Sequence, residues 1–286
     1  MADRSLRTGA TVRELLREAC RDLAHLESAR LDAELLLAQV LGIRREGLYA
    51  HPELEATEPA ALEFRALIGK RRTEYPVAYL IGRRGFWNLD LEVTPATLIP
   101  RPETELIVAA ALEQIPAQAA WRILDLGTGS GAIALAIASE RPACTVYATD
   151  IDPKTLATAE VNRAAGDLPN VHLQQVDWLI NFGETAFDLI LSNPPYVASG
   201  DPALYTGETA HEPRLALDGG VDGLGPIRRI IPAAFDHLKI GACLMLEHGA
   251  TQGAAVRALL AASGYQDPET LRDLAGHERV SLGNRP

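Results

Sequence analysis

Between residues 11 and 73, hydrophobic positions recur at the three- and four-residue steps of amphipathic helices. Three stripes share this spacing: Val12, Leu15, Leu16, Ala19 and Leu23; Leu31, Leu35, Ala38 and Leu41; and Leu62, Leu67 and Ile68. Gly42 suits the end of the second helix, and Pro59 suits the first turn of the third. We therefore expect a small helical bundle over residues 1–75 that docks a substrate and carries no catalytic motif. Its basic clusters, Arg44-Arg45 and Lys70-Arg71-Arg72, are expected to be solvated.

The hydrophobic period changes between residues 76 and 100. Tyr79-Leu80-Ile81-Gly82 and Phe86-Trp87-Asn88-Leu89 have the composition of strands, and Gly82 and Gly85 bracket a turn between them. This pattern predicts a β-hairpin that connects the helical bundle to the rest of the chain.

Beyond Ala120, short apolar runs alternate with helical segments, and a further helix is expected at Glu103–Ile115. The runs are Arg122–Leu126, Thr145–Thr149, His172–Val176, Phe187–Ser192 and Cys243–Glu247. Asp152-Pro153 has the composition of a helix start. Two strand candidates between Gly264 and Asn284 lack a crossover helix, which favours an antiparallel edge pair. Residues 101–286 are therefore predicted to form an α/β domain with a doubly wound, mostly parallel sheet.

Composition excludes several classes of protein. Hydrophobic residues make up 47% of the 286 residues and charged residues 23%, which argues against a disordered chain. No apolar run is long enough for a spanning helix, so no membrane partner is expected. Cys20, Cys144 and Cys243 lie far apart without CxxC spacing, which excludes a disulfide scaffold or thiolate zinc site. With a polar first segment and no apolar signal, we expect a cytoplasmic protein that holds no metal.

The net charge of −11 is unevenly distributed. Residues 1–100 carry 14 Lys and Arg against 15 Asp and Glu, and the remainder carries 13 against 23. A strongly acidic C-terminal part is a poor partner for a phosphate backbone, because duplex binding depends on Lys and Arg displacing counterions. We therefore expect no direct contact with nucleic acid, and a positively charged protein surface or a cationic cofactor suits this part better.

The first chemical signal is Asp125-Leu-Gly-Thr-Gly-Ser-Gly131, between a predicted strand and a predicted helix. Glycines let the backbone turn sharply and approach a ligand closely, and the strand ends of such sheets bind ligands. Asp150 ends the next strand, where it can accept hydrogen bonds from a ribose. Gly127 to Ala132 also satisfies the loose dinucleotide fingerprint, so this motif alone leaves the cofactor open.

The second signal is Asn193-Pro-Pro-Tyr196, directly after a buried strand. The two prolines fix the chain and have no N–H, so their carbonyl groups and the Asn193 side chain present acceptors. A planar NH2 group can donate to these acceptors while Tyr196 offers an aromatic face. Such an arrangement leaves the nitrogen facing a methyl donor and favours methyl transfer over hydride transfer.

These motifs resemble those of class I S-adenosylmethionine methyltransferases that act on planar amide or amino nitrogens. Three further stretches are similar to the release factor glutamine methyltransferase family, historically called HemK. They are Leu98-Ile-Pro-Arg-Pro-Glu-Thr-Glu105, Glu212-Pro213 with Ala216-Leu217, and Gly219-Gly-Val-Asp-Gly223. The resemblance covers nearly the whole chain.

The resemblance implies N5-methylation of the glutamine in the Gly-Gly-Gln motif of peptide chain release factors, with S-adenosylmethionine as the methyl donor. In that family the glycine loop, here Gly127 to Gly131, holds the methionine end of the cofactor. Asp150 would bind the ribose hydroxyls, and Asp177 and Trp178, after the third strand, would border the adenine. These cofactor residues are Gly127, Thr128, Gly129, Ser130, Gly131, Asp150, Asp177 and Trp178. The substrate amide is assigned to Asn193, Pro194, Pro195 and Tyr196, with Asn193 also near the cofactor.

Other functions share parts of this pattern. A glutamine methyltransferase of a large-subunit ribosomal protein would share Asn193-Pro-Pro-Tyr196, although Arg101-Pro-Glu-Thr-Glu105 favours the release factor family. An N6-adenine methyltransferase of nucleic acid is disfavoured by the acidity of the chain. A dehydrogenase or a nucleotide-binding regulatory module would require the Asn193 motif to be accidental.

Overall fold

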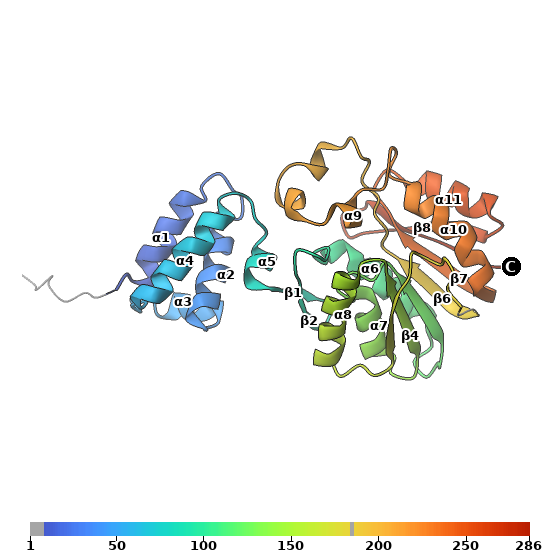
Figure 1. Cartoon of the computed structure of the whole chain (residues 1–286), viewed down its shortest axis with the longest axis horizontal. Helices are drawn as coiled ribbons and strands as arrows, with labels where there is room; N and C mark the ends of the chain where they lie inside the picture. Colours follow the sequence, from blue (N-terminus) through green and yellow to red (C-terminus); the bar gives the residue numbers. More distant parts are fainter. Residues whose placement is uncertain (1–8, 184–185) are drawn as a thin grey trace, which may run out of the picture. The chain divides into compact units, whose positions relative to one another are not determined.

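The computed structural model describes residues 9–183 and 186–286, which fall into two compact units (Figure 1). The first unit ends at Gly82 and the second begins at Arg83. This boundary lies beyond the position 75 expected from the sequence. The predicted connector is also not a segment of its own, because both strands of the hairpin belong to the second unit.

The first unit is helical. Its helices are α1 (Val12–Asp22), α2 (Ala29–Leu41), α3 (Arg45–Ala50), α4 (Glu58–Arg71) and α5 (Val77–Ile81). Thr11 and Glu14 form a reciprocal capping box at the start of α1, and Gly42 ends α2 in the left-handed conformation with φ of 63°. The three predicted helices are confirmed, and α3 and α5 are additional.

The buried face of α4 differs from the predicted stripe. Leu62 is exposed, whereas Phe64, Ile68 and Arg71 are buried. The expectation that Arg71 is solvated is therefore wrong. Its Nε donates to Oδ2 of Asp32 on α2 at 2.7 Å, and a buried guanidinium of this kind requires such a carboxylate partner.

The predicted first strand of the hairpin, Tyr79–Gly82, is wrong because this segment belongs to α5 and its C-cap. The carbonyl oxygen of Pro76 accepts from the N–H groups of Tyr79 and Leu80 at 3.1 and 3.2 Å, and Gly82 ends the helix with φ of 80°. A proline start and a left-handed glycine end make a short helix from an apolar pentapeptide.

The hairpin instead consists of β1 (Arg83–Phe86) and β2 (Leu89–Glu92), which pair antiparallel. The predicted second strand, Phe86–Leu89, therefore contains the turn. Trp87 lies in this turn with φ of 55°, and its N–H donates to Oε1 of Glu105 at 2.8 Å. This long-range bond stabilises a turn that has no glycine.

The second unit contains one seven-stranded sheet within the described residues, with strand order β5-β4-β3-β6-β7-β9-β8. Its strands are β3 (Arg122–Leu126), β4 (Thr145–Asp150), β5 (Val171–Gln175), β6 (Phe187–Ser192), β7 (Leu238–Glu247), β8 (Gln266–Arg272) and β9 (Glu278–Asn284). The first five strands in this order run parallel, and β9 pairs antiparallel with both β7 and β8. The predicted strands and the antiparallel edge pair are confirmed.

Helices cover both faces of this sheet (Figure 1). They are α6 (Glu105–Gln114), preceded by the 3₁₀ turn η1 (Pro102–Thr104), then α7 (Ala132–Glu140), α8 (Pro153–Ala165), α9 (Arg214–Leu217), α10 (Gly225–His237) and α11 (Gly253–Ala262). Two further 3₁₀ turns are η2 (Pro202–Leu204) and η3 (Glu208–His211). One core packs α6 and α7 on the sheet and the other packs α10 and α11. The predicted doubly wound α/β fold is therefore confirmed.

The strand order places the ligand-binding edge. From β3 the chain continues to β4 and β5 on one side and later returns to β6 and β7 on the other. A crevice forms at the carboxyl ends of the strands where the order reverses. Among the described residues, no helix combines the length and apolar character needed to cross a membrane.

Candidate active site

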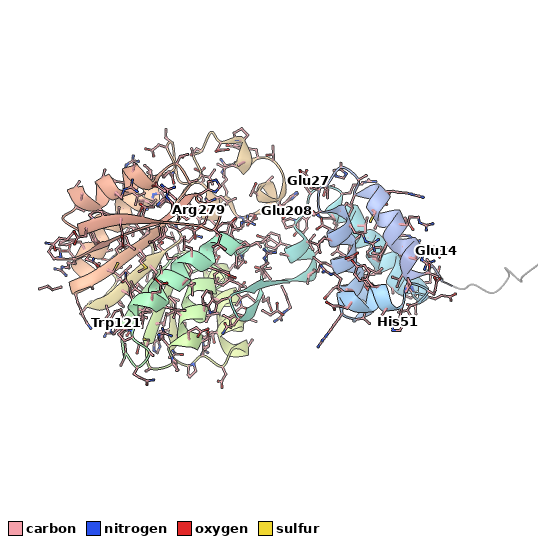
Figure 2. All side chains as sticks on the ribbon, turned by 180° about the vertical axis from the view of Figure 1, so that it is seen from behind. Glu14, Glu27, His51, Trp121, Glu208 and Arg279 are labelled. Atoms are coloured by element: carbon pink, nitrogen blue, oxygen red, sulfur yellow. The ribbon has the colours of Figure 1, made fainter. Side chains whose placement is uncertain are left out.

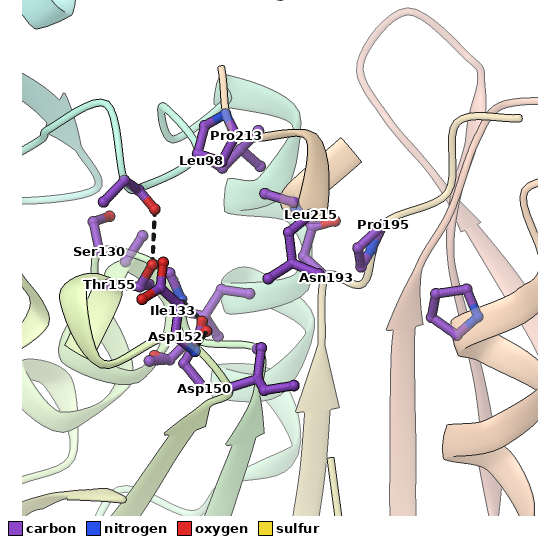
Figure 3. A pocket seen from close by; sticks show the side chains of 18 of the residues that line it. Leu98, Ser130, Ile133, Asp150, Asp152, Thr155, Asn193, Pro195, Pro213 and Leu215 are labelled. Carbon is purple, nitrogen blue, oxygen red and sulfur yellow. Dashed lines mark hydrogen bonds between the residues drawn. The ribbon is translucent and has the colours of Figure 1, made fainter. Parts of the chain in front are cut away.

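A cavity of about 280 Å³ lies at the carboxyl ends of β3, β4 and β6 (Figure 3). The candidate residues that line it are Gly127, Thr128, Gly129, Ser130, Asp150, Asp177, Trp178, Asn193 and Pro195. Gly131, Pro194 and Tyr196 are not part of this lining. Figure 3 shows Asn193 and Pro195 on one side of the cavity and Asp150 and Asp152 on the other. Two motifs far apart in the sequence thus meet around one space.

Four N–H groups of the glycine loop donate to acceptors within the protein. Those of Gly127 and Thr128 both donate to the Thr149 carbonyl at 2.9 Å, and that of Gly129 donates to the Asp150 carboxylate at 3.1 Å. That of Gly131 donates to the Thr128 carbonyl at 2.9 Å. A pyrophosphate site requires such groups to point at the ligand. Four of the five N–H groups from Gly127 to Gly131 therefore have acceptors within the protein, which leaves few loop N–H groups for a pyrophosphate.

Asp125, on β3, holds the glycine loop through a buried hydrogen bond. It is fully buried, and its Oδ2 accepts from the Thr128 hydroxyl at 2.6 Å. Burial raises the pKa of Asp125 to about 7, against the opposing effect of that hydrogen bond. The side chain is inaccessible to a ligand, so its role is to hold Thr128 and the loop in place.

Two polar groups of the lining suit a nucleoside with a charged tail. The Ser130 hydroxyl is buried and has no hydrogen-bond partner within the described residues, so a polar ligand group would satisfy it. The Asp150 carboxylate already accepts from the N–H groups of Gly129 and Asp152 at 3.1 and 3.0 Å, which fixes its orientation. Burial raises the pKa of Asp150, and the backbone N–H groups oppose that shift. A charged carboxylate there can accept from ribose hydroxyls.

The residues after β5 close the cavity on another side. A Cβ placed on Gly127, whose φ is 72°, would lie 3.3 Å from the Trp178 ring, so the loop backbone approaches this ring as closely as a glycine allows. Trp178 has φ of 52°. Asp177 instead pairs with Arg229 of α10 at 3.0 Å. Trp178 is thus the apolar surface, whereas the carboxylate of Asp177 already has a partner.

Asn193 is oriented by a residue that the sequence analysis did not assign. Its Nδ2 donates to the hydroxyl oxygen of Thr104 at 3.1 Å. The opposite atom of the same amide, Oδ1, is then the acceptor that Asn193 offers to the cavity. Thr104 ends η1 and is almost completely buried.

Tyr196 and Glu247 line a second cavity, together with Arg101, Glu103, Glu208 and Arg279. Glu208 and Arg279 are labelled in Figure 2. The Tyr196 hydroxyl donates to Oε1 of Glu247 at 3.3 Å. Burial raises the pKa of Tyr196 well above its ordinary value. The tyrosine therefore remains a neutral hydrogen-bond donor at physiological pH.

Comparisons with known proteins extend over both units. A family model described as the PrmC N-terminal domain matches residues 14–82, and one described as the methyltransferase small domain matches residues 105–210. The release factor glutamine methyltransferase of Escherichia coli K12 is 45% identical over 268 residues, which is 94% of this chain and 96% of that protein. The Pseudomonas aeruginosa protein of the same name is 48% identical over 96% of this chain and 98% of its own length. The chain belongs to the release factor glutamine methyltransferase family.

Solved structures agree on the fold. A methyltransferase from Pyrococcus furiosus has a TM-score of 0.53 with 23% identity, over 77% of this chain and 96% of its own. A Thermus thermophilus 16S rRNA methyltransferase in complex with AdoMet and guanosine has a TM-score of 0.54 with 18% identity, over 71% of this chain and 50% of its own. At these identities the likeness concerns the fold alone: the sheet and helices of this chain are arranged as in these two solved structures.

The stretch Leu98–Glu105, which points to the release factor glutamine methyltransferase family, is fixed by an ion pair between half-buried Arg101 and a buried carboxylate. The guanidinium of Arg101 pairs with Oε1 of Glu212, whose side chain is fully buried. Oε2 of Glu212 accepts from the N–H of Ile99 at 3.0 Å. Glu212 thereby holds Pro100 and Arg101 at the cavity that they line.

The family motif Gly219–Gly223 lies against the Asn193–Tyr196 segment. The N–H of Gly219 donates to the Val197 carbonyl at 2.8 Å. A Cβ on Gly223 would lie only 2.3 Å from the Tyr196 carbonyl oxygen, and Gly223 has φ of 74°. Glycine is required at Gly223 both for its conformation and for this close approach.

Sequence reasoning missed Thr104, Glu212 and Glu247 as members of the site. Thr104 lies in the family stretch Leu98–Glu105, and Glu212 begins the family stretch Glu212-Pro213. Their place in these stretches was the available signal. Glu247 ends a predicted apolar run, and a carboxylate at the carboxyl end of a buried strand is a recognisable signal of a site.

Proposed function

We propose that this protein transfers a methyl group from S-adenosylmethionine to the side-chain nitrogen of the glutamine in the Gly-Gly-Gln motif of peptide chain release factors, in the cytoplasm. The observation that carries the proposal is the position of the Asn193 amide across one cavity from Asp150 and the glycine loop. Family membership supports the reaction, and the internally bonded loop argues against a dinucleotide cofactor.

The cofactor residues have separate tasks. Gly127 to Gly131 hold the methionine end, with the buried Ser130 hydroxyl as one polar contact. Asp150 accepts from the ribose hydroxyls, and Trp178 borders the adenine, with Asp177 at its edge. S-adenosylmethionine supplies an electrophilic methyl group on a sulfonium centre.

The substrate residues orient a weak nucleophile. Oδ1 of Asn193 and the carbonyl oxygen of Pro194 accept the two hydrogens of the glutamine NH2 group. Pro195 keeps the backbone of this segment rigid, and the Tyr196 ring packs on the amide plane. These acceptors become stronger partners as positive charge develops on the nitrogen, so orientation and fixed dipoles supply most of the acceleration without a dedicated base.

The direct test is methylation of purified substrates with labelled S-adenosylmethionine. A release factor should take up label on the glutamine of its Gly-Gly-Gln motif, located by peptide mass analysis. A large-subunit ribosomal protein and adenine-containing DNA and RNA, assayed in parallel, should stay unlabelled. Label on one of these and none on the release factor would transfer the proposal to that substrate class.

Replacing Asp150 by alanine should weaken S-adenosylmethionine binding by about 10- to 100-fold, because each hydrogen bond to a charged group contributes about 1.5–3 kcal/mol. Calorimetric titration measures this dissociation constant. Asp236→Ala is the matched control, since it removes an exposed carboxylate from α10 away from the cavity. Equal affinities for Asp150→Ala and wild type would remove Asp150 from the site.

The helical unit is proposed to dock the release factor, because it contributes no residue to the described lining of either cavity. A chain lacking residues 1–82 should show a strongly raised KM for intact release factor and an unchanged dissociation constant for S-adenosylmethionine. Steady-state kinetics and calorimetry separate these two effects. Wild-type KM in the shortened, folded chain would show that docking lies elsewhere.

A further inference from the structure

The second cavity, of about 490 Å³, adjoins the first. Arg101 lines both cavities, and the Asn193–Tyr196 segment also contributes to both: Asn193 and Pro195 line the first, whereas Tyr196 lines the second. An extended peptide advances by about 3.3 Å per residue. The neighbours of a glutamine held at Asn193 can therefore reach the second cavity, which lies where a peptide substrate continues.

Glu247 is the buried carboxylate of this second lining. It ends β7 and has only 1% of its surface exposed. Its Oε1 accepts from the Tyr196 hydroxyl at 3.3 Å, whereas its Oε2 is buried and has no hydrogen-bond partner among the residues that the structure describes. A buried carboxylate oxygen left in this way is costly. A hydrogen-bond donor of a ligand in the second cavity would satisfy it.

The two guanidinium groups of the same lining already have carboxylate partners outside it. Arg101 pairs with the buried Glu212, and Nε of Arg279 donates to Oδ2 of Asp273 at 3.0 Å. Each of these positive charges is therefore compensated by a neighbour, so the second cavity is poorly suited to an anionic ligand.

Two carboxylates of the lining lack such compensation. Within residues 9–183 and 186–286, neither Glu247 nor the exposed Glu103 of η1 forms an ion pair. Burial raises the pKa of Glu247 to about 7, although Arg279 favours its charged form from a distance. A cationic group beside Glu247 would lower that pKa again and keep the carboxylate charged. The second cavity thus suits a donor that carries positive charge.

We propose that the second cavity is a subsite for a lysine or arginine side chain of the release factor, close in sequence to the methylated glutamine. Oε2 of Glu247 accepts a hydrogen bond from this side chain, and Glu103 attracts it at the rim. The inference rests on the proposed function, because it describes how the same site selects the surroundings of its glutamine. Since neither carboxylate touches the reacting nitrogen, their contribution is to substrate binding and specificity.

The test begins with Glu247→Gln, which removes the charge and keeps an oxygen that can accept from Tyr196. The KM for the release factor should rise about 10- to 100-fold, because one partner of a buried charge pair is lost. The kcat and the dissociation constant for S-adenosylmethionine should not change. Glu103→Lys should raise the KM about tenfold by repulsion. Glu113→Lys is the matched control, since Glu113 is exposed on α6 and lines neither cavity.

The second arm changes the substrate. Each lysine and arginine near the methylated glutamine of the release factor is replaced, one at a time, by methionine, which keeps a long side chain without the charge. One replacement should raise the KM of the wild-type protein about as much as Glu247→Gln does. With that release factor, Glu247→Gln and Glu103→Lys should have little further effect, because both partners of one contact are already separated.

The inference is overturned if no replacement in the release factor raises the KM, or if Glu247→Gln costs the same with every release factor variant. The second result is what a purely structural role of Glu247, or a bond to an uncharged donor, would give. Glu103→Lys, at an exposed position, decides the matter if Glu247→Gln does not fold. Failure of the wild-type protein to methylate the unchanged release factor would instead refute the proposed function.

Discussion

Replacing Asn193 by alanine should lower the single-turnover rate of release factor methylation by about 10²–10³-fold, because one preorganised polar partner of the developing charge is lost. The fold and S-adenosylmethionine binding should persist, since Asn193 is half-buried and its side chain is hydrogen-bonded to Thr104. Rapid-quench measurements with both substrates saturating isolate the transfer step from binding.

Asn88→Ala is the matched control, because Asn88 is exposed in the turn of the β1–β2 hairpin and lines neither cavity. It should transfer methyl groups at the wild-type rate. A wild-type rate in Asn193→Ala would mean that the glutamine amide is held by other groups, and the assignment of the catalytic residues would have to be abandoned.

Gly223→Ala should reduce turnover by about 10²-fold without contacting the substrate. The added methyl group would lie 2.3 Å from the Tyr196 carbonyl oxygen, so the Asn193–Tyr196 segment must shift. A displacement of about 1 Å near reacting groups can cost this much. S-adenosylmethionine affinity, measured by calorimetry, should change little because the glycine loop lies elsewhere.

Gly220→Ala separates this collision from backbone strain. Gly220 has φ of 88°, close to the 74° of Gly223, but a Cβ there meets nothing within 4 Å. Both variants incur a similar left-handed strain of about 1–2 kcal/mol, and only Gly223→Ala should lose turnover. Equal turnover in the two variants would show that the glycine motif does not support the Asn193–Tyr196 segment.

The sheet could be predicted because its signals are local. Arg122–Leu126 and Phe187–Ser192 are short apolar runs with turn residues beside them, and both are strands with the predicted bounds. The cap at Asp152 before Pro153 is equally local. Both chemical motifs follow buried strands, which allowed their meeting at one sheet edge to be expected from topology alone.

The interactions that escaped prediction join residues far apart in the sequence. Arg71 lies 39 residues from Asp32, Thr104 lies 89 from Asn193, and Arg101 lies 111 from Glu212. The periodicity of the sequence cannot predict such pairs, because each pair depends on how two distant elements pack against each other in the folded protein. The prediction for the segment that forms α5 was wrong for another reason. Five apolar residues are too few to show a helical or strand period, and only Pro76 and Gly82 mark the ends of the helix.

The internally bonded glycine loop has a consequence for competition inside the cell. ATP and NAD carry the same adenosine as S-adenosylmethionine, yet each also carries phosphates that lose hydration on entering a cavity. The loop N–H groups of Gly127, Thr128, Gly129 and Gly131 already donate to protein acceptors, so they cannot replace that hydration. Abundant nucleotides should therefore be poor inhibitors, and effective inhibitors of this site should carry a cationic or zwitterionic tail in place of phosphate.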